Sequence, residues 1–477
     1  MAAWYGDALL ELPHPPGWTV ETHLPSTPPP LAHDDLVRAL EHPVGQAPIR
    51  ELAAGRRRPL IIVDDLTRPT PADLVIPIVL RHLADAGIPA PEVRILLGTG
   101  AHGPAPLAAV ARKVGREAAA SCRLISHDAR RNSVPLGRTS YGSPVLVDRE
   151  VARSDLLIGI GGVYPQHSVG FGGGSKLVLG ALGRRSIVSL HYGHPSMAGS
   201  LNIDNDFRRD LDEMSALIGL RTLITMHVDA DRRPVRIVAG DHLRFYREAV
   251  EFSRTRYRAP APGDADVVLA NAYPMDVSLT FARSKALAAL AHAGPAASRV
   301  LVAACPEGLG HHALFPFLNG PRLERQRHMA RKLSVVRPAT VPGKVIRRGA
   351  RLVRRGTRPA PDARPVQGYA GEIHAGPHRP VLLHAPAGLA GPLPAAIPGM
   401  ELVDSWEGVL ARIAQDHPGR TRLRVAVYPC GPLHCLDTGE EEAAAPPAHQ
   451  DQVRRPTQPQ RAASAASPTP ADVTTER

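Results

Sequence analysis

Residues 59–98 read PLIIVDDLTRPTPADLVIPIVLRHLADAGIPAPEVRILLG, and this stretch decides the expected fold. It begins with the short apolar run 59–63 and continues through a polar loop at 64–71. Apolar residues then follow the period of a helix over 72–87, and a second apolar run comes at 93–98. A strand, a helix and a strand in this order form a βαβ unit, which predicts neighbouring parallel strands.

Further segments extend this predicted sheet. A helix is expected over 106–122, and it leads to a strand at 123–127. Residues 155–162 have the composition of another buried strand. An amphipathic helix at 206–220, two more strand patterns and a further helix complete the first half of the chain.

The same alternation of strands and helices continues and predicts an α/β fold throughout. Proline and glycine become frequent at 259–265, where a new α/β rhythm begins, so we place a domain boundary there. We expect an N-terminal catalytic and cofactor-binding domain over 1–260 and a C-terminal α/β domain over 265–438. Each should hold a parallel-type sheet, with the active-site cleft between the domains. Residues 439–477 are poor in apolar side chains, which predicts a disordered tail.

The charge of the chain raises the question of a nucleic-acid partner. The 477 residues carry a formal net charge of +12, and much of this excess lies at 321–364, which we expect to be a basic insertion. Aromatic residues make up 4% of the chain and none lies among these arginines, so the stacking surface of single-strand binding proteins is missing. We expect a solvated insertion, with an anionic partner as the alternative.

Other features of the composition predict a cytoplasmic protein with no membrane partner. The sequence has no run of roughly eighteen apolar residues, and it begins with acidic residues where a secretory leader would carry a basic end. Four cysteines are too few for a disulfide framework in so long a chain. Cys430 and Cys435 lack the two-residue spacing of a zinc knuckle, so ordinary thiols are expected.

Polar side chains cluster directly after four predicted strands, at the sheet edge where open α/β folds bind ligands. The clusters contain Asp64, Asp65, Thr67 and Arg68 after 59–63, Thr99 and His102 after 93–98, His127 after 123–126, and His167 with its glycines after 155–162. Turns and helix caps use the same residue types. Four clusters at one edge nevertheless favour a binding site.

Several of these residues have competing interpretations. Asp65 is equally suited to cap the helix that begins near Pro71. Arg68 offers the planar guanidinium fork that binds carboxylates, which favours a substrate role. His102 lies in the turn Gly-Thr-Gly-Ala-His-Gly, which cannot be core, so a functional role is favoured there too. His127 lies in a plain polar turn and is expected to be structural.

The densest group of reactive residues is YPQHSVGFGGGSKLVLGALGRRSIVSLHYGH at 164–194. Its glycines permit positive φ and a close approach of the backbone to a ligand, so Lys176 is placed for chemistry. The run GFGGGSK is similar to a phosphate-binding P-loop. However, Ser175 stands where that loop needs a glycine and Leu177 where it needs a hydroxyl, so an NTPase is disfavoured.

Together these motifs resemble the nickel-pincer lactate racemases and related 2-hydroxyacid racemases and epimerases, over roughly residues 15–320. The similarity rests on DDLTRPTP at 64–71, GTGAHG at 98–103, HSVGFGGGSK at 167–176, SIVSLH ending at His191, NAYPMD at 271–276 with Lys285 after it, and CPEGLG at 305–310. Members of this family bind nickel held by a pyridinium mononucleotide with two thioacid arms, one of which a lysine can join. The resemblance implies an isomerase with this nickel-pincer nucleotide, and cofactor-synthesis proteins as partners.

The resemblance also implies a role for each matching position. It assigns His102 and His167 as the acid/base pair, Arg68, Asp65 and Lys285 as substrate-binding residues, Lys176 as the covalent tether, Thr99, Gly173 and Gly174 as cofactor-binding residues, and His191 as the metal ligand. The gap from Lys176 to His191 is one residue shorter than the family pattern, which keeps His194 as an alternative ligand. His191 and His194 have metal-ligand spacing for a helix, but Gly193 between them indicates a helix end.

The implied reaction is hydride removal, because the hydrogen beside a carboxylate is too weakly acidic for an imidazole to remove as a proton. A planar 2-keto acid can take the hydride back on either face, so two histidines on opposite sides serve the two enantiomers. Phe281 or Ala282 replaces a glutamine expected before Lys285, and Trp406 lies in a helical pattern that packing alone would explain. These departures favour a 2-hydroxy acid other than lactate. The alternatives are a non-catalytic or cofactor-handling homologue and a phosphate- or anion-binding basic protein.

Overall fold

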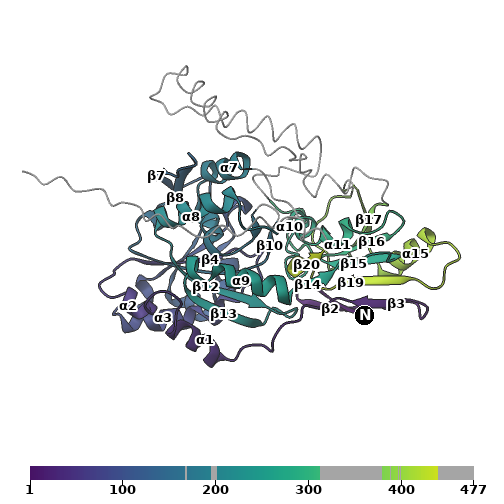
Figure 1. The fold of residues 1–477 in the computed structure, drawn as a ribbon, viewed down its shortest axis with the longest axis horizontal. Helices are drawn as coiled ribbons and strands as arrows, with labels where there is room; N and C mark the ends of the chain where they lie inside the picture. Colours follow the sequence, from purple (N-terminus) through teal and green to yellow (C-terminus); the bar gives the residue numbers. More distant parts are fainter. Residues whose placement is uncertain are drawn as a thin grey trace, which may run out of the picture. The chain divides into compact units, whose positions relative to one another are not determined.

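The computed structural model contains two six-stranded sheets and the helices that cover them (Figure 1). It describes residues 1–166, 169–194, 201–311, 379–386, 388–395, 397 and 399–438, without the side chains of Tyr192, Ser284 and Lys285. His167, the basic insertion at 321–364, the tail at 439–477 and the side chain of Lys285 lie outside the described part, so the predictions made for them stay predictions.

The first sheet has the strand order β13-β12-β9-β4-β5-β6. Its parallel strands are β4 (Pro59–Asp64), β5 (Arg94–Gly98), β6 (Arg123–Ser126), β9 (Leu156–Gly162) and β12 (Thr222–Val228), and β13 (Pro234–Asp241) pairs antiparallel with β12. In the register of β4 and β5, Leu60 lies opposite Arg94 and Asp64 lies opposite Gly98. This pairing confirms the parallel βαβ unit predicted from residues 59–98.

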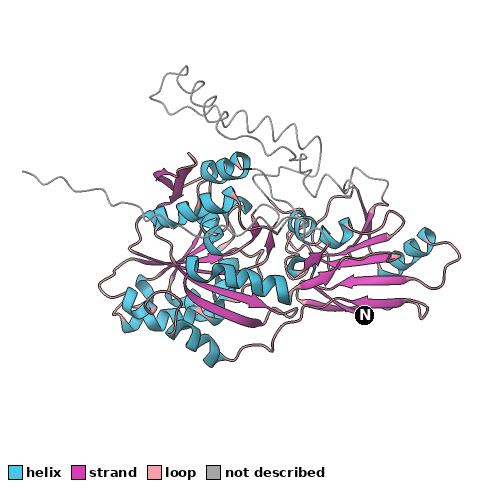
Figure 2. Cartoon of the chain, in the orientation of Figure 1, coloured by secondary structure: helices cyan, strands magenta, loops and turns pink. Residues whose placement is uncertain are grey.

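Helices cover both faces of the first sheet (Figure 2). On one face, Ile61 and Val63 pack with α1 (His33–Glu41), α2 (Ile49–Leu52), α3 (Ile76–Asp85), α4 (Leu107–Val114) and α5 (Arg116–Ser121). On the other, Leu60 and Ile62 pack with the 3-10 helix η4 (Gly174–Ala181), α7 (Arg184–Gly193), α8 (Asp206–Ile218) and α9 (His242–Arg256). Burial on both faces explains why β4 is an uninterrupted apolar run.

The second sheet has the order β18-β17-β16-β15-β19-β3, and all of its neighbouring strands are parallel. The strands are β3 (Thr19–Thr22), β15 (Val267–Asn271), β16 (Ser298–Val302), β17 (Val381–His384), β18 (Met400–Val403) and β19 (Arg424–Tyr428), with helices α10 (Leu279–Lys285), α11 (Leu287–Ala291) and α15 (Trp406–Asp416). The predicted α/β class with parallel sheets is confirmed. Strand β3 comes from the range assigned to the N-terminal domain, and Met1–Thr438 form one compact unit. The domain boundary near residue 260 therefore stays a prediction.

Short elements complete the structure. Four two-stranded sheets pair β1 (Ala2–Tyr5) with β2 (Ala8–Glu11), β7 (Ser133–Arg138) with β8 (Pro144–Asp148), β10 (Pro165–Gln166) with β11 (Gly170–Phe171), and β14 (Arg258–Pro260) with β20 (Cys435–Asp437). The remaining short helices are η1 (Ala72–Leu74), η2 (Ala90–Glu92), η3 (Gly100–His102), α6 (Arg149–Ala152) and η5 (Gly431–Leu433). No helix in the described part of the chain is long and apolar enough to cross a membrane.

Two local predictions can be compared with the structure. The single helix expected over 106–122 is wrong in its continuity, because Gly115 has a φ of +87° and separates α4 from α5. Trp406 starts α15, is buried, and donates a hydrogen bond from Nε1 to the carbonyl oxygen of Pro13 at 2.5 Å. It therefore packs, as its position in a helical pattern indicates.

Candidate active site

Asp65 and His102 form a hydrogen-bonded pair at the carboxyl edge of the first sheet. Asp65 follows β4 and His102 ends η3, which follows the neighbouring strand β5. Nδ1 of the imidazole donates to Oδ2 of the carboxylate, and the amide and hydroxyl of Thr67 donate to the other carboxylate oxygen at 3.1 and 2.5 Å. Asp65 is buried, while the His102 side chain keeps 20% of its surface exposed. A carboxylate thus orients an accessible imidazole.

Neighbouring charges and hydrogen bonds shift the pKa values of both Asp65 and His102. Burial raises the pKa of Asp65, but the charges of His102 and Arg68 and the hydrogen bonds from His102 and Thr67 prevail and hold it well below its usual range. Burial lowers the pKa of His102, Asp65 opposes that effect, and Arg68 and Lys176 add to it. Because the ionised carboxylate can only accept, Nδ1 of His102 carries a hydrogen, and Nε2 is the ring nitrogen that gains or loses a proton when the imidazole titrates.

The structure excludes the alternative that Asp65 caps a helix. The helical turn η1 begins after Pro71, and no side chain caps it. The carboxylate of Asp65 instead contacts Thr67 and His102. Of the two interpretations left open by the sequence, the one that places Asp65 in the site agrees with these contacts.

Lys113 on α4 anchors the loop that carries Asp65 and Arg68, and the sequence did not single it out. Its Nζ atom lies 2.9 Å from Oδ1 of Asp64 and donates to the carbonyl oxygens of Arg68 and Thr70, each at 2.9 Å. The hydroxyl of Thr70 donates to Oδ2 of Asp64 at 2.5 Å. Burial raises the pKa of Asp64, against the effects of Lys113 and Thr70. The Lys113 ammonium therefore binds the loop at the Asp64 carboxylate and at two backbone carbonyls.

Arg68 lies beside the pair and contacts a ring from the second half of the chain. Its guanidinium carbon is 5.9 Å from the centroid of the Phe281 ring, and its Nη1 atom donates to the Thr67 hydroxyl at 3.1 Å. The edge of Phe281, on α10, also meets the ring of His102, with 4.3 Å between centroids and an interplanar angle of 82°. Phe281 thus touches both the imidazole and the guanidinium.

The glycine loop is packed against the chain itself. Gly173 and Gly174 have φ of +74° and +55°, and a Cβ on Gly173 would approach Val163 to 2.8 Å. A Cβ on Gly174 would approach the ring of Tyr246 to 2.7 Å. Internal packing therefore already requires both glycines, which the sequence interpretation attributed to the approach of a ligand. Their assignment as cofactor-binding residues stays a prediction.

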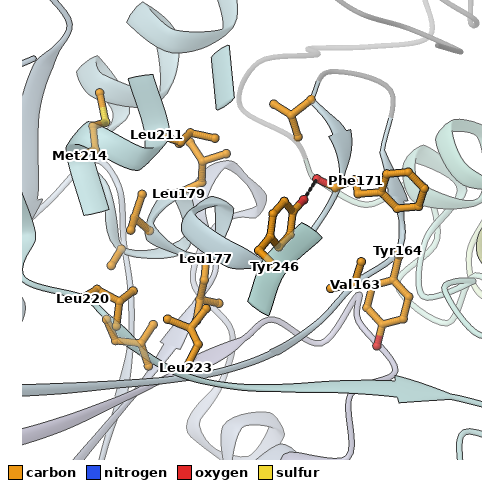
Figure 3. Packing of buried hydrophobic residues seen from close by; sticks show 14 of the residues in the cluster. Val163, Tyr164, Phe171, Leu177, Leu179, Leu211, Met214, Leu220, Leu223 and Tyr246 are labelled. Carbon is orange, nitrogen blue, oxygen red and sulfur yellow. Dashed lines mark hydrogen bonds between the residues drawn. The ribbon is translucent and has the colours of Figure 1, made fainter. Parts of the chain in front are cut away.

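Lys176 extends from η4, whose apolar side chains pack into the core. Figure 3 shows Leu177 and Leu179 of this helix among buried side chains of α8 and β12. Burial, followed by the charges of Arg68 and Arg208, lowers the pKa of Lys176 to about 7, although Asp65 opposes this effect. A large share of this amine is therefore unprotonated and nucleophilic at neutral pH.

His191 presents one ring nitrogen to the same region. Its Nδ1 atom donates to the carbonyl oxygen of Ile187 at 2.8 Å, one turn earlier in α7, so Nε2 carries the lone pair. Burial lowers the pKa of His191 to about 4, and the charges of Lys176 and His102 contribute. Nε2 of His194, by contrast, donates to Asp210 at 2.7 Å. Each of the two candidate ligands thus has one ring nitrogen engaged in a hydrogen bond, and the assignment of His191 as the metal ligand stays a prediction.

Thr99 and His127 form hydrogen bonds that connect the loops near these residues. The hydroxyl of Thr99 donates to the carbonyl oxygen of His127 at 2.7 Å. His127 is fully buried, with Nδ1 2.8 Å from Asp148 and Nε2 2.9 Å from the carbonyl oxygen of Leu182. The structural role expected for His127 agrees with these contacts, whereas the cofactor role of Thr99 stays a prediction.

Within the described residues, the predicted side chains converge. The loops after β4 and β5 supply Asp65, Arg68 and His102, and the charges of Lys176 and His102 act on His191. No group of three or more His, Cys, Asp or Glu among the described residues is placed to hold a metal. Phe281 and Lys113 are the contacting residues that the sequence missed, and both come from helices remote in sequence from the residues they touch.

Comparison with known proteins finds similarity to lactate racemases. Residues 5–200 match the lactate racemase N-terminal domain. The lactate racemase of Lactiplantibacillus plantarum is 27% identical over 288 residues, which are 58% of this chain and 67% of that protein. The lactate racemase of Thermoanaerobacterium thermosaccharolyticum is 25% identical over 321 residues, 65% of this chain and 75% of that protein. The chain is therefore similar to lactate racemases over more than half of its length.

Solved structures share the fold of this chain. The lactate racemase apoprotein from Thermoanaerobacterium thermosaccharolyticum matches with a TM-score of 0.65 at 19% identity, covering 91% of this chain and 99% of that one. A protein from Thermotoga maritima matches with a TM-score of 0.52 at 14% identity, covering 86% and 100%. The resemblance found in the sequence and the predicted fold class are both confirmed.

Proposed function

We propose that this protein racemises or epimerises a 2-hydroxy acid with the help of a nickel-pincer nucleotide. The observation that carries the proposal is the Asp65–His102 pair, held beside Arg68 and a half-buried Lys176 whose pKa is lowered to about 7. Similarity to two lactate racemases supports racemase activity. When bound, the nucleotide supplies a hydride acceptor, which protein side chains do not provide.

The residues present fit a covalently tethered cofactor. Nζ of Lys176 has no hydrogen bond or ion pair to another described residue, although the side chain lies in a buried, cationic setting. Such a setting favours the unprotonated amine, which is the form that can attack an acyl carbon. Lys176 would thus hold one thioacid arm covalently, and Gly173, Gly174 and Thr99 would line the approach.

His191 fits the position of a nickel ligand. Its Nδ1–H is engaged by a backbone carbonyl, as is usual for imidazoles that bind a metal through Nε2. A depressed pKa keeps the ring neutral at physiological pH, as ligation requires. Imidazole beside soft sulfur donors suits nickel rather than magnesium.

The side chains around Arg68 would bind and orient the substrate. Its guanidinium would pair with the carboxylate in a fork, assisted by Lys285. His102 would take the hydroxyl proton at Nε2 of the imidazole, while Asp65 would stabilise the imidazolium that forms. His167 would perform the same proton transfer for the opposite enantiomer. Phe281, at the point where a glutamine was expected, would present an apolar edge to the substrate.

A racemisation assay tests this proposal. The full chain is produced together with the cofactor-synthesis proteins and offered a panel of enantiopure 2-hydroxy acids, with loss of optical purity followed by chiral chromatography. We expect turnover of at least one acid by the wild type, and loss of turnover in Lys176→Ala, His102→Ala and His167→Ala. His292→Ala, at an exposed histidine directly after α11, is the control and should retain turnover.

The outcomes separate the alternatives. Cofactor attached to the chain without turnover of any acid would favour a cofactor-handling homologue over a racemase. An absence of both cofactor and turnover would favour an anion-binding protein. Turnover that survives both histidine substitutions would contradict the assigned proton transfer.

A further inference from the structure

Helices α8 and α9 both form hydrogen bonds with the glycine loop. Arg208 on α8 donates to the carbonyl oxygen of Gly173 at 3.0 Å and to the hydroxyl of Tyr246 at 2.5 Å. Tyr246 on α9 in turn contacts the carbonyl oxygen of Phe171 at 3.3 Å, the dashed line in Figure 3. One helical turn after Arg208 lies Asp212, and one turn before Tyr246 lies His242.

Asp212 and His242 meet at the hydroxyl of Ser175, the residue directly before Lys176. Oγ of Ser175 lies 2.5 Å from Oδ1 of Asp212 and 2.9 Å from Nε2 of His242. Nδ1 of His242 lies 2.9 Å from the carbonyl oxygen of Arg221. Ser175 and His242 are each 1% exposed. Asp212, Ser175 and His242 therefore form a hydrogen-bonded chain in which Ser175 and His242 are buried and Asp212 is half-buried.

Counting the hydrogen atoms shows how many protons the hydrogen bonds between Asp212, Ser175 and His242 require. The carbonyl of Arg221 can only accept, so Nδ1 of His242 carries a hydrogen and Nε2 of the neutral ring is an acceptor. Ser175 has one hydrogen and can donate it either to His242 or to Asp212, not to both. Both short contacts are satisfied only if one further proton is present, either on Asp212 or on His242. The buried chain is therefore a place where one titratable proton is held.

We propose that Asp212, Ser175 and His242 share one titratable proton and thereby fix the turn that presents Lys176. They are positioning residues, because none of them needs to touch substrate or cofactor. This inference depends on the proposed function only for the role of Lys176 as the cofactor tether. Neither that tether nor the reaction enters the argument for the shared proton.

The groups that face His242 shift its pKa in both directions, and the net effect is to lower it. Burial lowers the pKa of His242, the hydrogen bond to Arg221 and the carboxylates of Asp241 and Asp212 raise it, and Arg208 lowers it. Ser215, on α8, is the remaining polar neighbour, with Oγ 3.4 Å from Nε2 of His242.

Labelling of Lys176 tests the positioning role without substrate, nickel or cofactor. The full chain is treated with trace acetic anhydride across a range of pH, and acetylation of the peptide that contains Lys176 is measured by mass spectrometry. The wild-type curve should have its midpoint at about 7. Ser175→Ala breaks the hydrogen-bonded chain and should raise the midpoint by at least about one pH unit, which is a roughly fivefold smaller unprotonated fraction at pH 7.

Two substitutions of Asp212 make the test specific. In Asp212→Asn the amide can donate to Ser175 permanently, so both contacts persist without the titratable proton, and the midpoint should stay at the wild-type value. Asp212→Ala removes the contact, keeps the Ser175–His242 bond, and should behave like Ser175→Ala, which preserves the test if Ser175→Ala fails to fold. Asp206→Asn, at an exposed carboxylate on the same helix, is the matched control.

The shared proton is tested by unfolding. Relative to Asp212→Asn, the wild type should lose thermal stability as pH rises, because only its folded state gives up a proton from this chain. Unchanged midpoints in both Ser175→Ala and Asp212→Ala, or parallel stability curves for the wild type and Asp212→Asn, would overturn the proposal. A wild-type midpoint near that of an ordinary lysine would instead count against Lys176 as the tether, which is a separate failure.

Discussion

The Nδ1 atom of His102 is hydrogen-bonded to the Oδ2 atom of Asp65, which joins the loops that follow two neighbouring parallel strands. The carboxyl ends of β4 and β5 lie side by side, so the two residues meet although 37 positions separate them in sequence. The carboxylate fixes which ring nitrogen carries a hydrogen, so Nε2 is the nitrogen that would exchange a proton in the proposed reaction.

Asp65→Asn should reduce catalysis more than binding. The amide cannot stabilise an imidazolium, and it can donate to Nδ1 of His102 and so favour the wrong tautomer. We expect kcat to fall by about 10²–10⁴-fold, the usual contribution of general acid–base catalysis, with little change in KM. Steady-state racemisation kinetics measure both constants. Asp73→Asn, at an exposed carboxylate after the same loop, is the control, and a kcat equal to that of the wild type in Asp65→Asn would refute the role.

Acid should destabilise the fold partly through His191. Its folded pKa of about 4 lies below the ordinary value, so the unfolded state binds more protons as pH falls from neutrality. The stability that His191 contributes is thus fully present above its ordinary pKa of about 6.5 and is lost progressively as pH falls from there through its folded pKa of about 4. His191→Asn preserves a donor to Ile187 and removes the titration.

Thermal unfolding at a series of pH values measures this contribution. The wild type should lose more stability than His191→Asn between pH 7 and pH 4. A pKa that differs by one between the folded and unfolded states corresponds to about 1.4 kcal/mol of unfolding free energy. Curves with the same slope in this interval would contradict the buried, neutral imidazole.

Removal of the Lys113 ammonium should destabilise the whole loop from Asp64 to Thr70. Lys113→Met leaves the buried Asp64 carboxylate without its partner and frees two backbone carbonyls. Breaking a buried pair in this way costs about 3–5 kcal/mol of unfolding free energy. Urea unfolding measures the loss, and the double variant Lys113→Met/Asp64→Asn should recover part of it. A loss no larger in Lys113→Met than in a control on the same helix such as Arg112→Met would argue against the anchor.

Phe281 should matter through its ring rather than its volume. It contacts the ring of His102 and the guanidinium of Arg68, and a cation–π contact contributes about 0.5–1 kcal/mol. Phe281→Leu is therefore expected to lower kcat/KM by up to about fivefold, whereas Phe281→Tyr should stay close to the wild type. Equal effects of the two substitutions on the kinetic constants would show that the aromatic contact is unimportant.

Local sequence patterns predicted the first sheet well, because period and strand length are encoded within each segment. The run PLIIV at 59–63 and the helical period after it gave β4 and α3 their positions, and the polar residues after the strands marked the edge that holds Asp65 and His102. Gly115 was harder to interpret, since its positive φ interrupts a helix whose apolar pattern continues across it.

Long-range contacts were not predictable from the sequence in this way. Lys113 anchors a loop more than forty positions away, and Phe281 comes from the other half of the chain. Nothing in their local sequence distinguishes a lysine or phenylalanine that packs on a helix from one that reaches a site. For the same reason the Ser175, Asp212 and His242 chain emerges only once α8 and α9 are placed against the glycine loop.

Peptide mass spectrometry of the full chain, produced together with the cofactor-synthesis proteins, tests the central claim most directly. The account predicts a nickel-containing protein in which the peptide that carries Lys176 has gained the mass of the nucleotide, while Lys176→Ala has no adduct. Cofactor bound at another residue, or an unmodified Lys176 peptide in protein that racemises a 2-hydroxy acid, would contradict it.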